Sequence, residues 1–206
     1  MHKITLVFQD ESRFGTITTF GRSWKPKGQD FEVQAKLGRE NLYLFGAVMP
    51  STGELFAQIY DKSNTESMND FIGKFAASSP DKFIIMILDR AGWHTTNGLK
   101  LPGNLALIFL PPVSPQLSPI ERLWKKIKTD FFHNRLHNNI EDVKRSIKAA
   151  VRLHRFSRRQ SHQSARAGIL MHINDISIKK AYKSSLAAGR RQNNPSSLSP
   201  VKGLHV

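Results

Sequence analysis

The sequence predicts an α/β fold in which a mixed β-sheet carries helices on its faces. Its length of 206 residues is sufficient for one domain with a full hydrophobic core. Apolar runs of strand length recur between residues 4 and 110, and several are apolar on both faces, as in covered strands. The early runs are joined like hairpins, whereas the later ones alternate with helical patterns. This order indicates a mixed sheet rather than a purely parallel one.

The expected strands are apolar or β-branched segments that end at polar turns. They cover residues 4–9, 14–20, 41–49, 54–60, 83–88 and 105–110. The first ends before three polar residues that begin with Asp10, and residues 50–53 form a turn. The fifth ends directly before Asp89, and Pro111 stops the sixth. Two buried strands therefore each deliver a carboxylate at their end.

Three amphipathic helices are expected, each preceded by a polar residue that can cap it. The second is the clearest, because Pro119 suits a first helical position and the apolar residues that follow repeat at helical spacing. A short helix is also expected at residues 95–99. The first main helix follows its cap, Asn64 or Thr65, and ends before Pro80. The second covers residues 119–132 with Ser118 as its cap, and the third covers residues 140–154 with Asn139 as its cap.

The net charge of +15 is concentrated toward the C-terminus. From Arg152 onward, 11 Lys and Arg residues stand against one acid, whereas residues 1–151 hold 20 against 15. Such a basic surface favours a polyanion such as nucleic acid as a partner, although a basic tail can also serve only for solubility. The polar composition beyond residue 155 predicts disorder. We therefore expect a folded domain at residues 1–155 and a basic, disordered tail at residues 156–206.

The sequence offers no signal for a membrane or for export. It contains no run of about 18 apolar residues, and its N-terminus lacks the basic-then-apolar pattern of a signal peptide. It contains no cysteine, which excludes disulfides and thiolate metal sites. We expect a cytoplasmic protein, associated with the nucleoid if its partner is DNA.

Three carboxylates form the candidate catalytic site. Asp10 and Asp89 each follow a buried strand, and Glu121 lies in the first turn of the second helix. If the two strands are parallel neighbours, their carboxylates meet at one end of the sheet, and such carboxylates repel one another unless cations lie between them. Oxygen ligands of this kind suit Mg²⁺ or Mn²⁺. Two such ions can activate a nucleophile and stabilise the leaving oxygen of a phosphodiester.

Each carboxylate also has a purely structural interpretation. Asp10 and Asp89 are common types of turn residue. Glu121 follows Ser118 at the spacing of a capping box, in which its side chain would accept from the backbone N–H of Ser118. It could equally pair with Lys125 one turn later. Taken one at a time, these interpretations outweigh the catalytic one.

Further residues are candidate DNA contacts. Trp24, with Lys25 and Lys27 beside it, could stack on a base and pair with phosphates, or it could be a hydrophobic plug. His94 lies five residues after Asp89 and could assist the site or pack in its loop. Arg122 and Lys125 are basic residues off the apolar face of the second helix, and they complete this set.

Four motifs taken together change these odds. In order, they are QDESRFG at residues 9–15, GRSWKPKG at 21–28, LDRAGWH at 88–94 and LPPVSPQLSPIERLW at 110–124. The set resembles the catalytic domain of DDE transposases of bacterial insertion sequences, relatives of the mariner group, over roughly residues 4–150. The last motif is the most specific, and the 32-residue separation of Asp89 and Glu121 is similar to that of the group.

The resemblance implies an RNase H-like fold with a mixed five-stranded sheet and helices on both faces. It implies that Asp10, Asp89 and Glu121 are a catalytic triad that holds two Mg²⁺ or Mn²⁺ ions. These ions would activate water to cut a transposon end and then activate the freed 3′-hydroxyl to attack target DNA, without a covalent protein–DNA intermediate. Insertion at a TA dinucleotide is a further family tendency.

The sequence departs from the family in three places. Full-length members carry an N-terminal helix-turn-helix region that recognises transposon ends, whereas this sequence begins at the first catalytic strand. That region is expected on a separately encoded chain or through frameshifting, or it is missing from a truncated copy. Val113 and Ser118 replace the usual Tyr and Asn, and Arg90 places a cation beside Asp89. The tail after about residue 156 has no family counterpart, which suggests a shifted reading frame or a read-through.

Three functions are compatible with these observations. The first is a metal-dependent DNA strand transferase, with DNA, a helix-turn-helix chain and a second copy of the chain as candidate partners. The second is a non-catalytic DNA-binding remnant that inhibits a full-length transposase. The third is a nuclease acting on RNA–DNA hybrids, which shares the fold and the metals. The intact triad favours the first.

Overall fold

A computed structural model describes residues 3–22, 24, 27–28, 32–94, 98–111 and 117–156. Its strands are β1 (Lys3–Gly15), β2 (Asn41–Met49), β3 (Glu54–Tyr60), β4 (Lys82–Leu88) and β5 (Leu105–Phe109). They form one five-stranded sheet in the order β3-β2-β1-β4-β5. β1 runs antiparallel to β2 and parallel to β4, so the predicted mixed five-stranded sheet is confirmed.

β1 is a single long strand, and the prediction of two separate strands at residues 4–9 and 14–20 is wrong. Residues 3–8 pair with 82–87 of β4, and residues 8–15 pair with 41–48 of β2. The strand thus exchanges one parallel neighbour for an antiparallel one on its other edge without a turn. The polar residues that begin at Asp10 resembled a turn, yet they lie in the ladder with β2.

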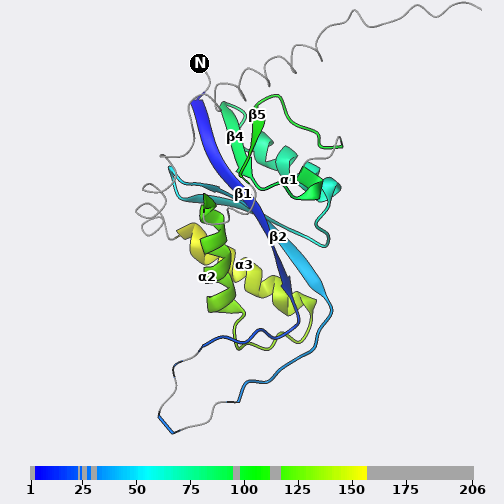
Figure 1. The fold of residues 1–206 in the computed structure, drawn as a ribbon, viewed down its shortest axis with the longest axis vertical. Helices are drawn as coiled ribbons and strands as arrows, with labels where there is room; N and C mark the ends of the chain where they lie inside the picture. The colour runs from blue at the N-terminus through cyan, green and yellow to red at the C-terminus, as the bar shows by residue number, and fades with distance from the viewer. Residues whose placement is uncertain are drawn as a thin grey trace, which may run out of the picture.

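Helices cover both faces of this sheet (Figure 1). One face packs against α1 (Thr65–Ala77), through a core that includes Phe45, Phe71 and Met86. The other face packs against α2 (Pro119–Phe131) and α3 (Ile140–Phe156), through a core that includes Leu44, Trp124 and Ile147. Phe45 and Leu44 are adjacent in β2 and point to opposite faces, as the two-residue period of a strand requires. The three main helices are therefore confirmed.

The helix starts agree with the prediction in position, but not in every contact. Asn64 and Asn139 cap α1 and α3, because their side chains accept from the backbone N–H groups of Ser67 and Asp142 at 2.9 Å. Ser118 precedes α2 as expected, but its side chain makes no capping hydrogen bond. A 3₁₀ turn, η1 (Gly92–His94), precedes the predicted short helix at residues 95–99, most of which lies outside the described residues.

The predicted tail lies almost wholly outside the part of the chain that the structure describes, which ends at Phe156. The division into residues 1–155 and 156–206 therefore stays a prediction. No helix among the described residues is long and apolar enough to cross a membrane.

Asn64→Ala is expected to lower the free energy of unfolding by about 1 kcal/mol, because the backbone N–H of Ser67 loses its acceptor. Urea unfolding monitored by circular dichroism would measure the change. Asn64→Asp is the matched control and should stay close to the wild type, since a carboxylate oxygen can accept the same hydrogen bond. An equal loss in both variants would contradict the capping role.

Candidate active site

Asp10 and Asp89 lie close to the point where the parallel pairing of β1 and β4 ends. The register of β1 and β4 pairs Phe8 with Ile87, so its continuation by two residues sets Asp10 opposite Asp89. Asp10 is still within β1, whereas Asp89 is the first residue after β4. The carboxyl ends of parallel strands are where α/β folds place their sites. The condition of parallel neighbouring strands is therefore met.

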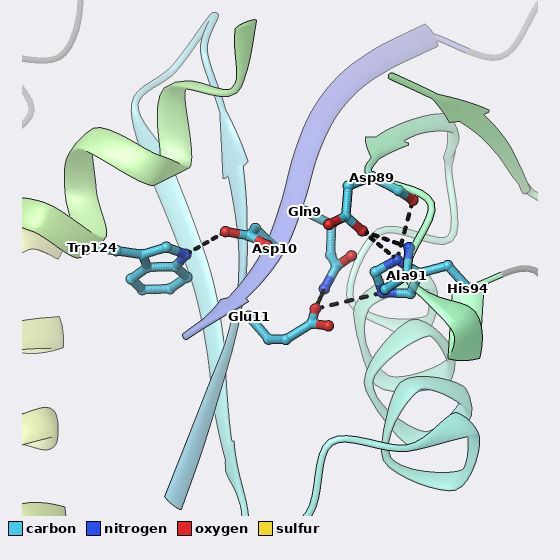
Figure 2. Close-up of polar contacts among 7 residues, drawn as sticks. All are labelled: Gln9, Asp10, Glu11, Asp89, Ala91, His94 and Trp124. Carbon is cyan, nitrogen blue, oxygen red and sulfur yellow. Dashed lines mark hydrogen bonds and ion pairs between the residues drawn. The ribbon is translucent and has the colours of Figure 1, made fainter. Parts of the chain in front are cut away.

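Asp10 points to the face of the sheet that α2 covers (Figure 2). Its Oδ2 accepts from the indole Nε1–H of Trp124 at 2.9 Å. Burial, and then repulsion from Glu11 and Glu121, raise the pKa of Asp10 to about 7, although the bond from Trp124 acts in the opposite direction. A carboxylate this strongly penalised as an anion is well suited to accept a cation.

Asp89 is held from the other side by His94. Its Oδ1 accepts from His94 Nδ1 at 2.9 Å and from the backbone N–H of Ala91 at 3.0 Å, while its side chain remains 61% exposed. The second ring nitrogen of His94 lies 3.5 Å from Glu11 Oε2, which also accepts from Gln9 Nε2 at 3.1 Å. Figure 2 shows this chain of contacts on the opposite side of β1 from Asp10.

The Asp89–His94–Glu11 chain shifts the pKa values of its members. Burial, the largest single effect, disfavours the charged His94 ring, but the hydrogen bonds and charges of Asp89 and Glu11 together raise its pKa to about 9. The hydrogen bond from His94 lowers the pKa of Asp89, against a smaller effect of burial. The imidazolium therefore bridges two carboxylates at neutral pH, with both ring N–H groups available as donors.

Glu121 is exposed at the start of α2. Within the described residues, its carboxylate neither accepts from the backbone N–H of Ser118 nor pairs with Lys125, so neither structural interpretation is observed. Its charge is close enough to Asp10 to raise the pKa of that group. The carboxylate of Glu121 is thus available to a ligand near Asp10.

The three carboxylates therefore lie around the region where β1 and β4 separate, each with its own surroundings. Among the residues that the structure describes, no three His, Cys, Asp or Glu side chains are grouped closely enough to hold a metal ion together. Asp10 has the electrostatic signature of a cation ligand, and the donor set of Asp10, Asp89 and Glu121 consists only of oxygen, as Mg²⁺ and Mn²⁺ prefer. These residues fit a divalent ion by chemistry, and their convergence on one ion stays a prediction.

The candidate DNA contacts differ in accessibility. Trp24 is fully exposed, and Lys27, Arg122 and Lys125 are also exposed, while Lys25 lies outside the described residues. His94 is 2% exposed, so its predicted direct contact with DNA does not fit this arrangement. Its interior position instead favours a role in holding Asp89.

Three residues of the site were not anticipated in these roles. Trp124 appeared only as the last residue of the motif at residues 110–124, but a buried indole N–H requires an acceptor, and this signal could have indicated a carboxylate partner. Glu11 looked like part of a turn. Gly46, the β2 residue that pairs with Asp10, appeared only as one position of an expected strand. A Cβ added there would lie 2.6 Å from Trp124 Cη2, and this close approach depends on the tertiary fold.

Comparisons with known proteins identify the family and the fold of the chain. The model of the family described as DDE superfamily endonuclease matches residues 5–144. An uncharacterised protein of Sinorhizobium fredii, y4pE/y4sA, is 37% identical over 102 residues, which are 49% of this chain and 76% of that protein.

Solved structures of Mos1 mariner transposase share the fold. Its paired-end complex with Mn matches with a TM-score of 0.60 and 12% identity, over 89% of this chain and 55% of that chain. Its isolated catalytic domain matches with a TM-score of 0.53 and 9% identity, over 89% of this chain and 81% of that chain. The chain thus spans about half the length of the longer Mos1 chains. The likeness confirms the RNase H-like fold, and the family match covers most of the chain. The chain belongs to the DDE superfamily endonuclease family.

Proposed function

We propose that this chain is the catalytic domain of a DNA transposase, which cuts DNA at transposon ends and transfers the cut strand into target DNA. The observation that carries the proposal is the register of β1 and β4, whose continuation sets Asp10 opposite Asp89 just beyond their last parallel pair. The raised pKa of Asp10, caused by burial and by the neighbouring Glu11 and Glu121, supports a cation there.

In this proposal, Asp10, Asp89 and Glu121 hold Mg²⁺ or Mn²⁺. When bound, such ions lower the pKa of an attacking water or 3′-hydroxyl and neutralise charge on the phosphodiester. The chain's own residues orient the ligands: Trp124 holds one oxygen of Asp10, and His94 and Ala91 hold one oxygen of Asp89. No described residue donates to the second oxygen of Asp89, which lies on an exposed side chain and is free to bind an ion.

DNA is the proposed partner because exposed cations flank this end of α2. Arg122 and Lys125 lie beside Glu121 on the first two turns of the helix and are exposed. Exposed Trp24 and Lys27 could contribute a base-stacking and phosphate-binding surface. A helix-turn-helix chain that supplies recognition of transposon ends, and a second copy of this chain, are further proposed partners, in a cytoplasmic, nucleoid-associated setting.

Isothermal titration with Mg²⁺ tests the proposed site. We expect micromolar-to-millimolar binding by the wild type, and loss of this binding in Asp89→Ala, because that substitution removes one of three carboxylate ligands. Asp81→Ala is the matched control: it removes an exposed carboxylate just before β4, at the far end of the strand from Asp89, and should leave binding unchanged.

A plasmid-nicking assay with the same proteins then links binding to chemistry. The wild type and Asp81→Ala should nick supercoiled DNA in Mg²⁺, and Asp89→Ala should not. Failure of the wild type to bind Mg²⁺ even with added DNA would contradict a catalytic role and favour a DNA-binding remnant. Preference for RNA–DNA hybrids over duplex DNA would instead identify a hybrid-specific nuclease.

A further inference from the structure

The indole of Trp124 joins α2 to β1 directly beside Asp10. Trp124 is 3% exposed, and its Nε1–H donates to Asp10 Oδ2 at 2.9 Å, across 114 positions of sequence. Figure 2 shows the ring reaching from the helix toward the carboxylate. A buried indole N–H needs an acceptor, and a carboxylate is a strong one. The contact satisfies Trp124 and fixes the orientation of one oxygen of Asp10.

Gly46 makes room for this ring. It is the β2 residue that pairs with Asp10 in the ladder. A Cβ added at Gly46 would lie 2.6 Å from Trp124 Cη2 and 3.0 Å from Ile120 Cδ1, so a larger residue there would have to displace α2 or its side chains. The missing side chain therefore lets the helix approach the sheet closely enough for the hydrogen bond to form.

The same helix carries Glu121, three residues before Trp124 and thus on a similar side of α2. The position of Trp124 over Gly46 therefore also determines how far Glu121 lies from Asp10. The Trp124 ring consequently positions two of the three carboxylates: Asp10 by a hydrogen bond, and Glu121 through the placement of the helix.

We propose that Trp124 is a positioning residue of the active site, which orients the Asp10 carboxylate through its indole N–H and, seated over Gly46, fixes the placement of Glu121 relative to Asp10. The inference rests on the proposed function, because the purpose of the arrangement is to present these carboxylates to a divalent cation. Trp124 itself contacts neither the cation nor DNA in this scheme.

NMR of ¹⁵N-labelled protein tests the hydrogen bond without any metal or substrate. The sequence contains three tryptophans, and the indole signal that disappears in Trp124→Phe is that of Trp124. We expect this signal to move upfield in Asp10→Ala, which removes the acceptor. It should stay near its wild-type position in Asp10→Asn, whose amide oxygen still accepts. A signal that does not respond to Asp10→Ala would overturn the proposal.

Calorimetry with Mg²⁺ separates positioning from packing. Trp124→Phe keeps an aromatic ring in the core but removes the donor, and we expect it to weaken Mg²⁺ binding about 10–100-fold, as is typical when a partner of a metal ligand is lost. Ile127→Val is the matched packing control, because it trims a fully buried residue of the same helix and should leave Mg²⁺ affinity unchanged. Wild-type Mg²⁺ affinity in Trp124→Phe would reduce Trp124 to a packing residue and overturn the proposal.

A double-mutant cycle tests the role of Gly46. Gly46→Ala should displace the indole and weaken Mg²⁺ binding by a similar factor. In the Trp124→Phe background, the Cη2 atom that blocks the new methyl group is absent, so Gly46→Ala should add little further loss. Fully additive losses would mean that the two residues act separately, against the proposal.

Different results would contradict the metal site and the role of Trp124. A wild type that binds no Mg²⁺ contradicts the proposed function itself, and the positioning of a cation site falls with it. The response of the Trp124 indole signal to Asp10→Ala still decides, in that case, whether the ring holds this carboxylate.

Discussion

Asp10→Asn is expected to abolish Mg²⁺-dependent DNA cleavage and, at the same time, to raise the free energy of unfolding at neutral pH. The amide is the same size as the carboxylate, and its oxygen can still accept from Trp124. It carries no charge, so it is a poor ligand for a divalent ion. The substitution also removes the unfavourable free energy of a buried anion that is repelled by Glu11 and Glu121. The site thus trades stability for function.

The pH dependence of this gain follows from the pKa of Asp10, which rises from 3.8 to about 7 on folding. Between these two values the folded protein binds more protons than the unfolded chain, so wild-type stability falls as the pH rises. Relative to Asp10→Asn, the loss begins near pH 4 and is complete above pH 7. Because Asp10 retains some contact with solvent, we expect a difference of about 2 kcal/mol rather than the full value of the shift.

Urea unfolding of both proteins from pH 4 to pH 8, in EDTA, would measure this difference. Asp81→Asn is the control, because it makes the same substitution at an exposed carboxylate outside the site. Added Mg²⁺ should restore stability to the wild type but not to Asp10→Asn, since only the former retains the ligand. Equal stability of the two proteins at pH 8 would show that Asp10 carries no electrostatic strain.

Buried strands and helix starts have local signatures, and from these the sequence predicted the mixed sheet and the positions of three carboxylates near its elements. The assignment of these carboxylates to a catalytic triad came from the resemblance to DDE transposases and stays a prediction. Runs such as residues 83–88 are apolar on both faces, and Pro119 marks a helix start. The continuity of β1 could not be predicted, because Asp10 and Glu11 have the composition of a turn, and only their pairing with β2 keeps them in the strand. A local pattern does not reveal that a strand changes partners along its length.

The side-chain partners of the carboxylates could not be predicted from the sequence for a related reason. Trp124 and Asp10 are 114 positions apart, and His94 touches Glu11 from a different element of the fold. Each of these residues has an ordinary local role, in an apolar helix face, a loop or a strand. Their joint role appears only when β1, β4 and α2 are brought together.

His94→Ala is expected to be the most destabilising change in the site. The ring is fully buried, and its charge lies between Asp89 and the mostly buried Glu11. Removing the cation breaks a buried ion pair with Glu11 and takes away a positive charge that compensates this carboxylate, which typically costs about 3–5 kcal/mol. Asp89 also loses a hydrogen bond that orients it, so Mg²⁺ affinity and cleavage should fall about 10–100-fold. Urea unfolding and calorimetry would measure the two effects.

The loss of stability in His94→Ala should depend on pH in a direction that the pKa shifts define. Folding raises the pKa of His94 from 6.5 to about 9, so the stabilisation is complete below pH 6.5 and disappears as the pH rises through 9. Folding lowers the pKa of Asp89, so the contribution of Asp89 to stability is present above pH 3.8 and disappears as the pH falls below that value. The difference in the free energy of unfolding between the wild type and His94→Ala should therefore be largest between about pH 4 and pH 6.5.

Glu11→Gln in the His94→Ala background decides whether charge is the cause. If the lost charge compensation of Glu11 accounts for the destabilisation, removing the Glu11 charge should recover part of the lost stability, so that the double variant is more stable than His94→Ala alone. Cleavage should not recover, because Asp89 still lacks the donor that orients it. Further destabilisation by Glu11→Gln would instead mean that His94 acts through its volume, and the chain from Asp89 to Glu11 would have no electrostatic role.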